Sequence, residues 1–344
     1  MEEPGVTSMP GMAPVAILAA AVLALGAAFP EPDPLDVGPG ERLLVVSPHP
    51  DDETLGAGAL VQRVIERGGT SRVAIVTSGD GYVEAVEYET GRARPRPADF
   101  LAYGERRMGE ARAAVRELGG GAVRLQFLGF PDGGLAPLLH AHWRRGHPER
   151  SPTTGAQAPP YPDVVDPKTA YDGADLQREL LTILREASPS VVALPDPADQ
   201  HPDHSATGLF TLLALEEYAR PAAEGGFGAG LPRILLYVVH WPSWPVGFGA
   251  KEPPGPDAPL ELPGDLPDPG LARVALRVGD AERSAKGAAL ARYASQQEVM
   301  ASFLAAFVRR TEPFRILAPP DLERIAGSIE RTIGSERWAP RSPP

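Results

Sequence analysis

The sequence predicts an α/β protein with a Rossmann-like, doubly wound and mostly parallel sheet that carries helices on both faces. Two observations support this prediction. Five short apolar runs, rich in β-branched residues or leucine and bounded by Gly, Pro or Asp, have the pattern of strands covered on both sides. Stretches of helical periodicity lie between these runs, and such an alternation favours right-handed parallel crossovers.

The predicted elements follow one another in a regular order. Strands are expected at residues 42–47, 72–77, 123–128, 191–194 and 234–239. Helices are expected at residues 54–67, 100–118, 174–186 and 205–218, and the chain from Ala281 onward is expected to be helical. Ligands of such a fold bind beyond the carboxyl ends of the strands, so functional side chains are expected there.

The 344 residues are expected to form one folded domain at 41–335. Residues 1–40 combine an apolar segment with a Pro-rich linker, and residues 336–344 form a Pro-rich tail. Two stretches dense in Pro and Gly, at about 137–171 and 242–270, are predicted to be loops. Long loops in a compact enzyme commonly shape a substrate entrance, and disorder is the alternative explanation.

The apolar segment at residues 13–29 suits the h-region of a signal peptide or a marginal membrane anchor. Export or membrane anchoring is therefore favoured over a cytoplasmic location, and this segment could contact a membrane. Against a signal peptide, Glu2 and Glu3 stand where positive charge is expected, and the small-residue cleavage site near Gly26 and Ala28 is weak. A disordered or surface-packed Ala-rich helix is the alternative.

Composition narrows the classes of partner and metal site. The chain has 45 acidic and 33 basic residues and no cluster of Lys or Arg, so nucleic acid is not expected as a partner. It has no cysteine, which excludes disulfides, thiolate metal ligands and cysteine nucleophiles. Any metal ion would have to be bound by His and carboxylate side chains.

Two clusters of acidic and imidazole side chains occupy matching positions in the predicted fold. A His-Pro-Asp-Asp-Glu motif at residues 49–53 follows the first strand and precedes the first helix. A His-Pro-Asp-His motif at residues 201–204 lies between a later strand and its helix. Two strand-to-helix loops of one parallel sheet open on the same edge, so we expect the clusters to meet although about 150 residues separate them.

These side chains suit hydrolysis of an amide by a metal-activated water. A catalytic zinc ion takes three N or O ligands from the protein and keeps one position for water, and His49, Asp52 and His204 could supply the ligands. Asp51 would then be free to take a proton from the water. His201 could donate a proton to the leaving amine.

Structural roles compete with these assignments. Asp203 could fix the tautomer and orientation of His201, but an acidic residue just before a helix is also an ordinary N-cap, and Asp51 or Asp203 could do only that. A single loop histidine usually has no catalytic role, and four of the seven histidines lie outside the clusters. Two acid-and-imidazole clusters in matched loops favour a functional site over a purely structural one.

With both motifs intact, the chain resembles the LmbE/PIG-L family of zinc-dependent N-acetylglucosaminyl deacetylases. This family includes deacetylases of N-acetylglucosaminyl-phosphatidylinositol and of mycothiol and bacillithiol synthesis, and its fold is Rossmann-like. The resemblance implies that His49, Asp52 and His204 bind zinc. It also implies that Asp51 is the general base and that His201 stabilises the oxyanion or protonates the leaving amine.

Weaker similarities extend over most of the predicted domain. They are the Arg-Met-Gly-Glu run at 107–110, the Gly-Phe-Pro-Asp-Gly run at 129–133, and Lys286 with the Ser-Gln pair at 295–296. The resemblance implies that Arg107 and Asp132 lie near the sugar. The alternatives are a solvated helix charge for Arg107 and an ordinary turn for Asp132.

A third group of candidates follows the last predicted strand. His240 leaves that strand at the catalytic edge and could line the pocket. Trp241 and Trp244 could stack on a sugar ring, although packing beneath the long loop is the more usual role of such side chains.

The leading expectation is a zinc-dependent deacetylase that uses a metal-activated water to remove an N-acetyl group from a small-molecule glycoside, a glycan or a glycolipid containing N-acetylglucosamine. Two alternatives stay open: an amidase with the same chemistry that acts on a non-sugar or thiol-conjugate amide, and a non-catalytic carbohydrate-binding envelope protein. Iron(II) or another divalent ion could occupy the same mixed N/O site in place of zinc. The acylated substrate and the oligomeric state are left open.

Overall fold

The computed structural model of the protein describes residues 32–220, 230–246, 255–267 and 270–333. The apolar segment at 13–29 and the tail at 336–344 lie outside the described residues, so a signal, anchor or tail there stays a prediction. Among the described residues, no helix is both long and apolar enough to cross a membrane.

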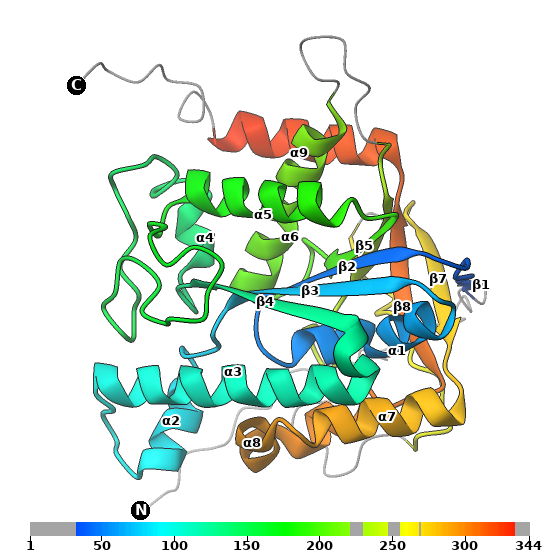
Figure 1. The fold of residues 1–344 in the computed structure, drawn as a ribbon, viewed down its shortest axis with the longest axis horizontal. Helices are drawn as coiled ribbons and strands as arrows, with labels where there is room; N and C mark the ends of the chain where they lie inside the picture. The colour runs from blue at the N-terminus through cyan, green and yellow to red at the C-terminus, as the bar shows by residue number, and fades with distance from the viewer. Residues whose placement is uncertain (1–31, 221–229, 247–254, 268–269, 334–344) are drawn as a thin grey trace, which may run out of the picture. The chain divides into compact units, whose positions relative to one another are not determined.

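One sheet of eight strands organises the described chain, in the order β1-β7-β8-β6-β5-β2-β3-β4 (Figure 1). The strands are β1 (Asp33–Pro34), β2 (Arg42–Ser47), β3 (Thr70–Thr77), β4 (Val123–Phe130), β5 (Val191–Pro195), β6 (Arg233–Tyr237), β7 (Ala272–Arg277) and β8 (Thr311–Leu317). β8 runs antiparallel to β6 and β7, and all other neighbours are parallel. The predicted mostly parallel sheet is therefore confirmed.

Helices cover both faces of this sheet, as predicted (Figure 1). One face carries α1 (Asp52–Glu66), α3 (Pro97–Gly119), α7 (Asp280–Leu290) and α8 (Ala294–Ala305), and the other carries α4 (Leu135–Leu138), α5 (Gly173–Ala187), α6 (Pro202–Ala219) and α9 (Pro319–Ile333). The short α2 (Val83–Thr90) packs against α3 and α8, and a 3-10 turn (Gly120–Ala122) precedes β4. Successive strand residues alternate between the two cores, so Val45 packs on the first face and Val46 on the second.

The C-terminal part contains two strands that the sequence did not predict, β7 and β8. The expectation that the chain is helical from Ala281 onward is therefore wrong for β8. Two charged residues of β8, Glu312 and Arg315, are buried. Glu312 pairs with Lys286 of α7, and Arg315 pairs with Asp196 after β5. Strands were predicted from apolar runs, and the charged residues of β8 interrupt such a run, so β8 was not recognised.

Strand β6 ends two residues before the predicted boundary because the chain beyond it bonds elsewhere. The backbone N–H groups of Val239 and His240 donate to Asp199 Oδ2, at 2.8 and 3.0 Å. Since these donors are taken by a side chain, they do not extend the strand ladder. The chain instead leaves the sheet beside the turn that precedes α6.

Residues assigned to the linker and to the first long loop contact the folded domain directly. Within the predicted linker, β1 pairs with β7, and Leu35 and Val37 are buried. Residues 139–172 contain no helix or strand, yet the buried Tyr161 donates its hydroxyl to Asp80 Oδ2 at 2.5 Å. This bond joins the loop to the residues that follow β3 at the carboxyl edge.

Two glycines allow the helices that follow both motifs to approach the sheet closely. A Cβ atom on Gly56 of α1 would lie 2.3 Å from Tyr237 Cδ2, and one on Gly208 of α6 would lie 2.5 Å from the carbonyl oxygen of Pro195. A larger residue at either position would force the helix outward together with the turn at its start.

Candidate metal centre and active site

The turn between β2 and α1 places the first acidic cluster at the carboxyl edge of the sheet. Thr77 of β3 donates its backbone N–H and its hydroxyl to Pro48 O, at 2.9 and 3.0 Å, which anchors the turn. Asp51 has a φ of 115°, a conformation that costs energy for a residue with a side chain. Its side chain makes no capping hydrogen bond to α1, so simple N-capping does not explain Asp51.

The turn before α6 presents the second cluster. His201 is the N-cap residue, and its Nδ1 accepts the backbone N–H of Asp203 at 3.2 Å. Asp199 Oδ1 accepts the backbone N–H of His201 at 2.9 Å. His204 lies one turn into the helix and is fully buried.

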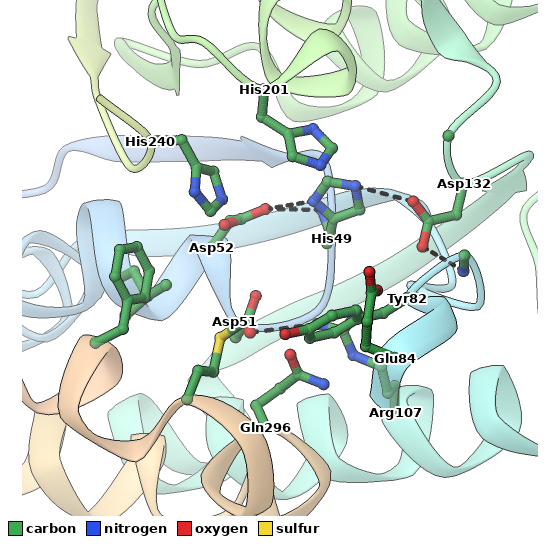
Figure 2. A pocket seen from close by; sticks show the side chains of 15 residues that line it. His49, Asp51, Asp52, Tyr82, Glu84, Arg107, Asp132, His201, His240 and Gln296 are labelled. Atoms are coloured by element: carbon green, nitrogen blue, oxygen red, sulfur yellow. Dashed lines mark hydrogen bonds and ion pairs between the residues drawn. The ribbon is translucent and has the colours of Figure 1, made fainter. Parts of the chain in front are cut away.

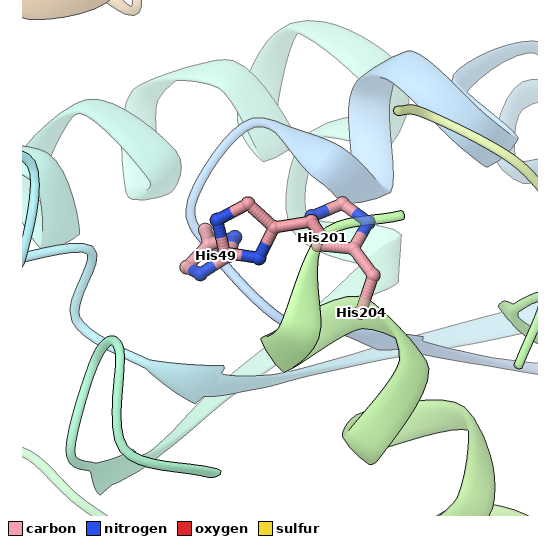
Figure 3. Close-up of side chains that lie close together, drawn as sticks. All are labelled: His49, His201 and His204. Atoms are coloured by element: carbon pink, nitrogen blue, oxygen red, sulfur yellow. The ribbon is translucent and has the colours of Figure 1, made fainter. Parts of the chain in front are cut away.

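The two turns meet, as the sequence analysis expected. The rings of His49, His201 and His204 lie within 4.8 to 5.2 Å of one another between their centroids (Figure 3). Asp52 Oδ2 is 3.0 Å from His49 Nδ1 and 3.1 Å from His204 Nε2. The three predicted metal ligands therefore converge around one carboxylate oxygen.

The surroundings of His204 fit a metal ion. Neither ring nitrogen makes a hydrogen bond of ordinary geometry to a described residue, although Asp52 Oδ2 and Asp199 Oδ2 lie 3.1 and 3.4 Å away. A buried imidazole nitrogen without a partner is costly, and a cation bound jointly with Asp52 would satisfy it. The donor set of two imidazoles and one carboxylate suits zinc and also other divalent ions.

The pKa values of Asp52 and His204 also fit a metal ion at this cluster. Burial would raise the pKa of Asp52, but His204 and His49 hold it well below its usual range. Burial would lower the pKa of His204, but Asp52 and Asp199 raise it to about 9. Protons on the imidazoles thus balance the buried carboxylates, and a divalent cation that displaced those protons would serve the same purpose.

The other ring nitrogen of His49 faces two further carboxylates. His49 Nε2 lies 3.2 Å from Asp132 Oδ1 and 3.4 Å from Asp203 Oδ2. Asp203 also accepts the backbone N–H groups of Gly133 and Leu135, at 2.7 and 3.1 Å. Its carboxylate therefore orients His49 and the start of α4. The expected contact of this carboxylate with His201 is replaced by a contact through the Asp203 backbone N–H.

Arg107 is a buried partner of Asp51 and not a solvated helix charge. Its Nη2 donates to Pro50 O at 2.5 Å and to Asp51 Oδ2 at 3.2 Å, and its Nη1 donates to Gly79 O at 3.0 Å. Burial raises the pKa of Asp51 to about 8, although the charge of Arg107 lowers it. Asp51 therefore holds a proton more tightly than an ordinary carboxylate does.

Asp132 is likewise more than a turn residue. Besides its contact with His49, it accepts the backbone N–H of Gly81 at 2.6 Å through Oδ2. It lies at the end of the cavity away from His240, beside Tyr82 and Glu84 (Figure 2). This position keeps it a candidate for substrate contact.

His201 and His240 line the cavity as neutral imidazoles. Burial, together with the positive charges on His49 and His204, lowers the pKa of His201 to about 3. Burial and the charge of His204 lower the pKa of His240 to about 4. The backbone N–H of Asp203 occupies Nδ1 of His201, so the neutral ring carries its proton on Nε2 and can donate from there.

The cavity above these side chains has a volume of about 400 Å³. Seven of its fifteen lining residues were candidates from the sequence, and eight were missed: Leu55, Gly81, Tyr82, Glu84, Gly133, Gln296, Met300 and Phe303. Gly133 and Gln296 had a signal, since each belongs to a run that supported the resemblance. Leu55 lies just after the first motif, and the other five lie in segments with no distinguishing motif.

Asp199 is the most informative of the missed residues. It is buried, faces His204 Nδ1, and accepts the backbone N–H groups of His201, Val239 and His240. Its carboxylate thus links three imidazole-bearing positions. Its place two residues before the His-Pro-Asp-His motif, after a strand end, was the available signal.

Helix α1 is broken just after the metal-binding turn, and a buried ion pair fills the break. Ala57 has non-helical dihedrals, with φ −144° and ψ 15°. Glu312 of β8 accepts the N–H groups of residues 59–60 at 3.0 and 2.9 Å. Lys286 of α7 donates to Leu55 O at 2.8 Å and to Glu312 Oε2 at 2.6 Å. The pair supplies the partners that the break removes, and so fixes the start of α1.

The fold and this cluster define an α/β enzyme with a buried His/Asp site that can hold a metal ion. The sequence matches the family described as GlcNAc-PI de-N-acetylase (PIG-L) over residues 44–215, which include both motifs. The chain therefore belongs to the PIG-L family of de-N-acetylases, and the predicted family resemblance is confirmed.

Named relatives agree with this assignment. A 1D-myo-inositol 2-acetamido-2-deoxy-alpha-D-glucopyranoside deacetylase of Geodermatophilus obscurus is 30% identical over 283 residues, which cover 78% of this chain and 86% of the relative. A deacetylase of the same name from Saccharopolyspora erythraea is 31% identical over 209 residues, and the alignment covers 60% of this chain and 66% of that protein. The chain thus spans slightly less than two thirds of the second relative.

Solved structures support the fold. A deacetylase of the teicoplanin biosynthesis pathway matches with a TM-score of 0.50 and 20% identity, over 80% of this chain and 98% of that one. The 4-carboxy-2-hydroxymuconate hydratase GalB of Pseudomonas putida also matches with a TM-score of 0.50, at 16% identity, over 82% and 97% of the two chains. A hydratase and a deacetylase share this fold, so the reaction must be argued from the site.

Proposed function

We propose that this protein is a metal-dependent hydrolase that removes the N-acyl group, acetyl in the simplest case, from a glycoside containing N-acetylglucosamine. One observation carries the proposal. Asp51 lines the cavity next to the point where His49, Asp52 and His204 converge, and its carboxylate is bonded to Arg107 and to none of these three. A binding module would not need this second, separate carboxylate, and family membership supports the same chemistry.

The metal ion would be held by His49, Asp52 and His204. When bound there, it would lower the pKa of a coordinated water and polarise the acyl carbonyl. Asp132 and Asp203 would hold the ring of His49 through Nε2, and Asp199 would face the ring of His204 through Nδ1. Such outer carboxylates orient imidazole ligands and raise their basicity.

We assign Asp51 the proton of the attacking water. Its carboxylate lines the cavity, and Arg107 holds its Oδ2 in place. His201 is placed to donate a hydrogen bond from Nε2 to the oxygen that gains negative charge. As that oxygen re-forms the carbonyl, the C–N bond breaks and the amine leaves with the proton that Asp51 accepted.

The sugar would lie at the Asp132 end of the cavity. Tyr82, Glu84 and Asp132 bring hydroxyl and carboxylate oxygens to this end (Figure 2). Such groups recognise sugar hydroxyls through hydrogen bonds. Arg107 is already bonded to two carbonyl oxygens and to Asp51, so we assign it the positioning of Asp51 before any contact with sugar.

The test combines metal analysis of purified protein with an assay of free amine release. Substrates are N-acetylglucosamine, its glycosides and its oligomers, each with and without chelator. We expect one metal ion per chain and amine release that chelator abolishes and added metal restores. Metal bound without release from any of these sugars would redirect the search to other amides. A chain without metal affinity would overturn the proposal.

A further inference from the structure

A second cavity, with aromatic, aliphatic and polar side chains in its wall, adjoins the catalytic one. It has a volume of about 660 Å³, and His240, Met300 and Phe303 line both cavities. Its remaining wall comes from α8, from the residues that follow β6 and from Gln200 before α6. The two cavities therefore meet at Met300 and Phe303. A ligand bound at the metal cluster could extend over these side chains into the second cavity.

The chemistry of this second cavity suits a neutral, apolar group. Trp241, Trp244 and Phe303 contribute aromatic surface, and no Lys or Arg is among the described residues that line it. Its one acidic residue, Glu298, is paired with Arg106 at 3.2 Å. Gln200, Ser243, Gln297 and Ser302 also line the cavity, so a hydrocarbon chain would lie along the side formed by the aromatic residues and Met300.

The aromatic walls are held in place by hydrogen bonds at their edges. Trp241 Nε1 donates to Asp265 Oδ1 at 2.8 Å, and Trp244 Nε1 donates to Glu261 O at 2.7 Å. The polar atoms of both indoles are thus occupied, and both rings also pack against Val238, Leu262 and Leu266, so only the remaining apolar surface of each ring faces the cavity. Preformed walls reduce the ordering cost of binding a flexible chain.

The second cavity adjoins the acyl side of the reaction. His240 lies on one side of Asp52 and His49, whereas Asp132, Tyr82 and Glu84 lie on the other (Figure 2). If the sugar lies on the Asp132 side, as proposed above, the scissile amide lies at the metal cluster, between the Asp132 side and the His240 side of the cavity. The acyl half of the amide then points toward His240 and Phe303.

We propose that the second cavity binds the hydrocarbon tail of an N-acyl group longer than acetyl, so that the substrate class is N-fatty-acylated amino sugars and their glycosides. This inference rests on the proposed function. The reaction stays a hydrolysis: the amide C–N bond breaks, water supplies hydroxide to the acyl carbon and a proton to the nitrogen. The products are a free fatty acid and an amine.

The test compares two substrate series with the metal-loaded full chain. In the first, glucosamine carries N-acetyl, N-butanoyl, N-hexanoyl or N-octanoyl groups. We expect kcat/KM to rise roughly two- to fourfold for each methylene that becomes buried. In the second series, N-acetylglucosamine carries methyl to octyl groups at the glycosidic oxygen. We expect kcat/KM to change little along this series. A rise with the glycosidic chain, or a flat or falling N-acyl series, would overturn the inference while leaving deacetylation intact.

A matched pair of variants locates the effect. Ala301 is exposed on α8 and lines the second cavity but not the catalytic one. Ala294 is exposed at the start of the same helix and lines neither cavity. Ala301→Trp should cut the ratio of N-octanoyl to N-acetyl turnover at least tenfold, whereas Ala294→Trp should leave it unchanged. Equal ratios in the two variants would place the acyl chain elsewhere.

A binding measurement separates this inference from the proposed function. Trp241 and Trp244 report on the cavity by fluorescence, so N-octanoylglucosamine and N-acetylglucosamine can be titrated into metal-loaded Asp51→Asn, in which turnover is expected to be too slow to interfere. Tighter binding of the octanoyl compound, lost in Ala301→Trp, would support the cavity assignment even if no sugar amide were cleaved. Equal weak binding of both compounds would refute it.

Discussion

The turn after β2 and the turn after β5 hold equivalent places in the sheet but are stabilised differently. The second turn is secured mostly within its own sequence, because Asp199 accepts the N–H of His201 and His201 accepts the N–H of Asp203. The first turn leads into a broken helix, and the break is filled by Lys286, 231 residues from the carbonyl it contacts. A metal-binding turn can thus be fixed by local capping or by a remote buried ion pair.

The largest effect is expected from the second turn, which carries the proposed metal ligand His204. We expect His204→Ala to lose the metal and to reduce amine release to background, because two protein ligands rarely retain a catalytic metal. Metal content per chain and turnover are the measurements. The control is His147→Ala, an exposed histidine outside both turns. Full metal content in His204→Ala would remove His204 from the ligand set.

The first turn carries the proposed base, Asp51, and its loss should separate chemistry from metal binding. We expect Asp51→Asn to keep its metal and to lose roughly 10²- to 10⁴-fold in kcat, which is the usual range for a general base. Metal analysis and kcat are measured on the same preparation. Unchanged kcat in the metal-loaded variant would assign proton transfer to another group.

Asp199 tests how far the second turn depends on its local network. Asp199→Asn removes the charge that faces His204 Nδ1, and we expect metal affinity to fall roughly 10- to 100-fold. Competition with a chelator measures this change, and turnover at saturating metal shows how much of the loss is recovered. Unchanged affinity would mean that the packing of α6 alone orients His204.

The remote ion pair should affect stability more than chemistry. Lys286→Met leaves the buried Glu312 without its partner charge, and we expect a loss of roughly 3–5 kcal/mol in unfolding free energy. Lys286→Met combined with Glu312→Gln should recover part of that loss, since no unpaired charge stays buried and the amide oxygen of Gln can still accept one of the two N–H groups of residues 59–60. Chemical denaturation measures both. A double variant no more stable than the single one would show that the break in α1 needs the charges themselves.

The sequence was sufficient for the features that depend on local patterns and on parallel topology. The strands β2 to β5 are short apolar runs, and both motifs follow strand ends. The meeting of His49, Asp52 and His204 follows from those two facts together. The confirmed family membership rests on the same motifs, and the catalytic roles of Asp51 and His201 stay predictions.

What the sequence could not supply depends on contacts between distant segments. β8 contains the charged residues Glu312 and Arg315. These residues can be buried in a sheet because each forms an ion pair with a residue of another element. Asp203 was expected to contact His201 through its carboxylate, but the start of α4 and His49 bind that carboxylate first. No residue pattern indicated that α8 would bring Met300 and Phe303 beside the catalytic cavity.

The position of β8 between β6 and β7 bears on how the chain folds as it is made. A nascent chain emerging from the ribosome offers β2 to β6 first, in the order that pairs them in parallel, and β8 is the last strand to appear. Until then the edge of β6 is open, and the break in α1 lacks Glu312. The edge of the sheet that carries the candidate site therefore reaches its final shape only after β8 has been made and has paired with β6 and β7.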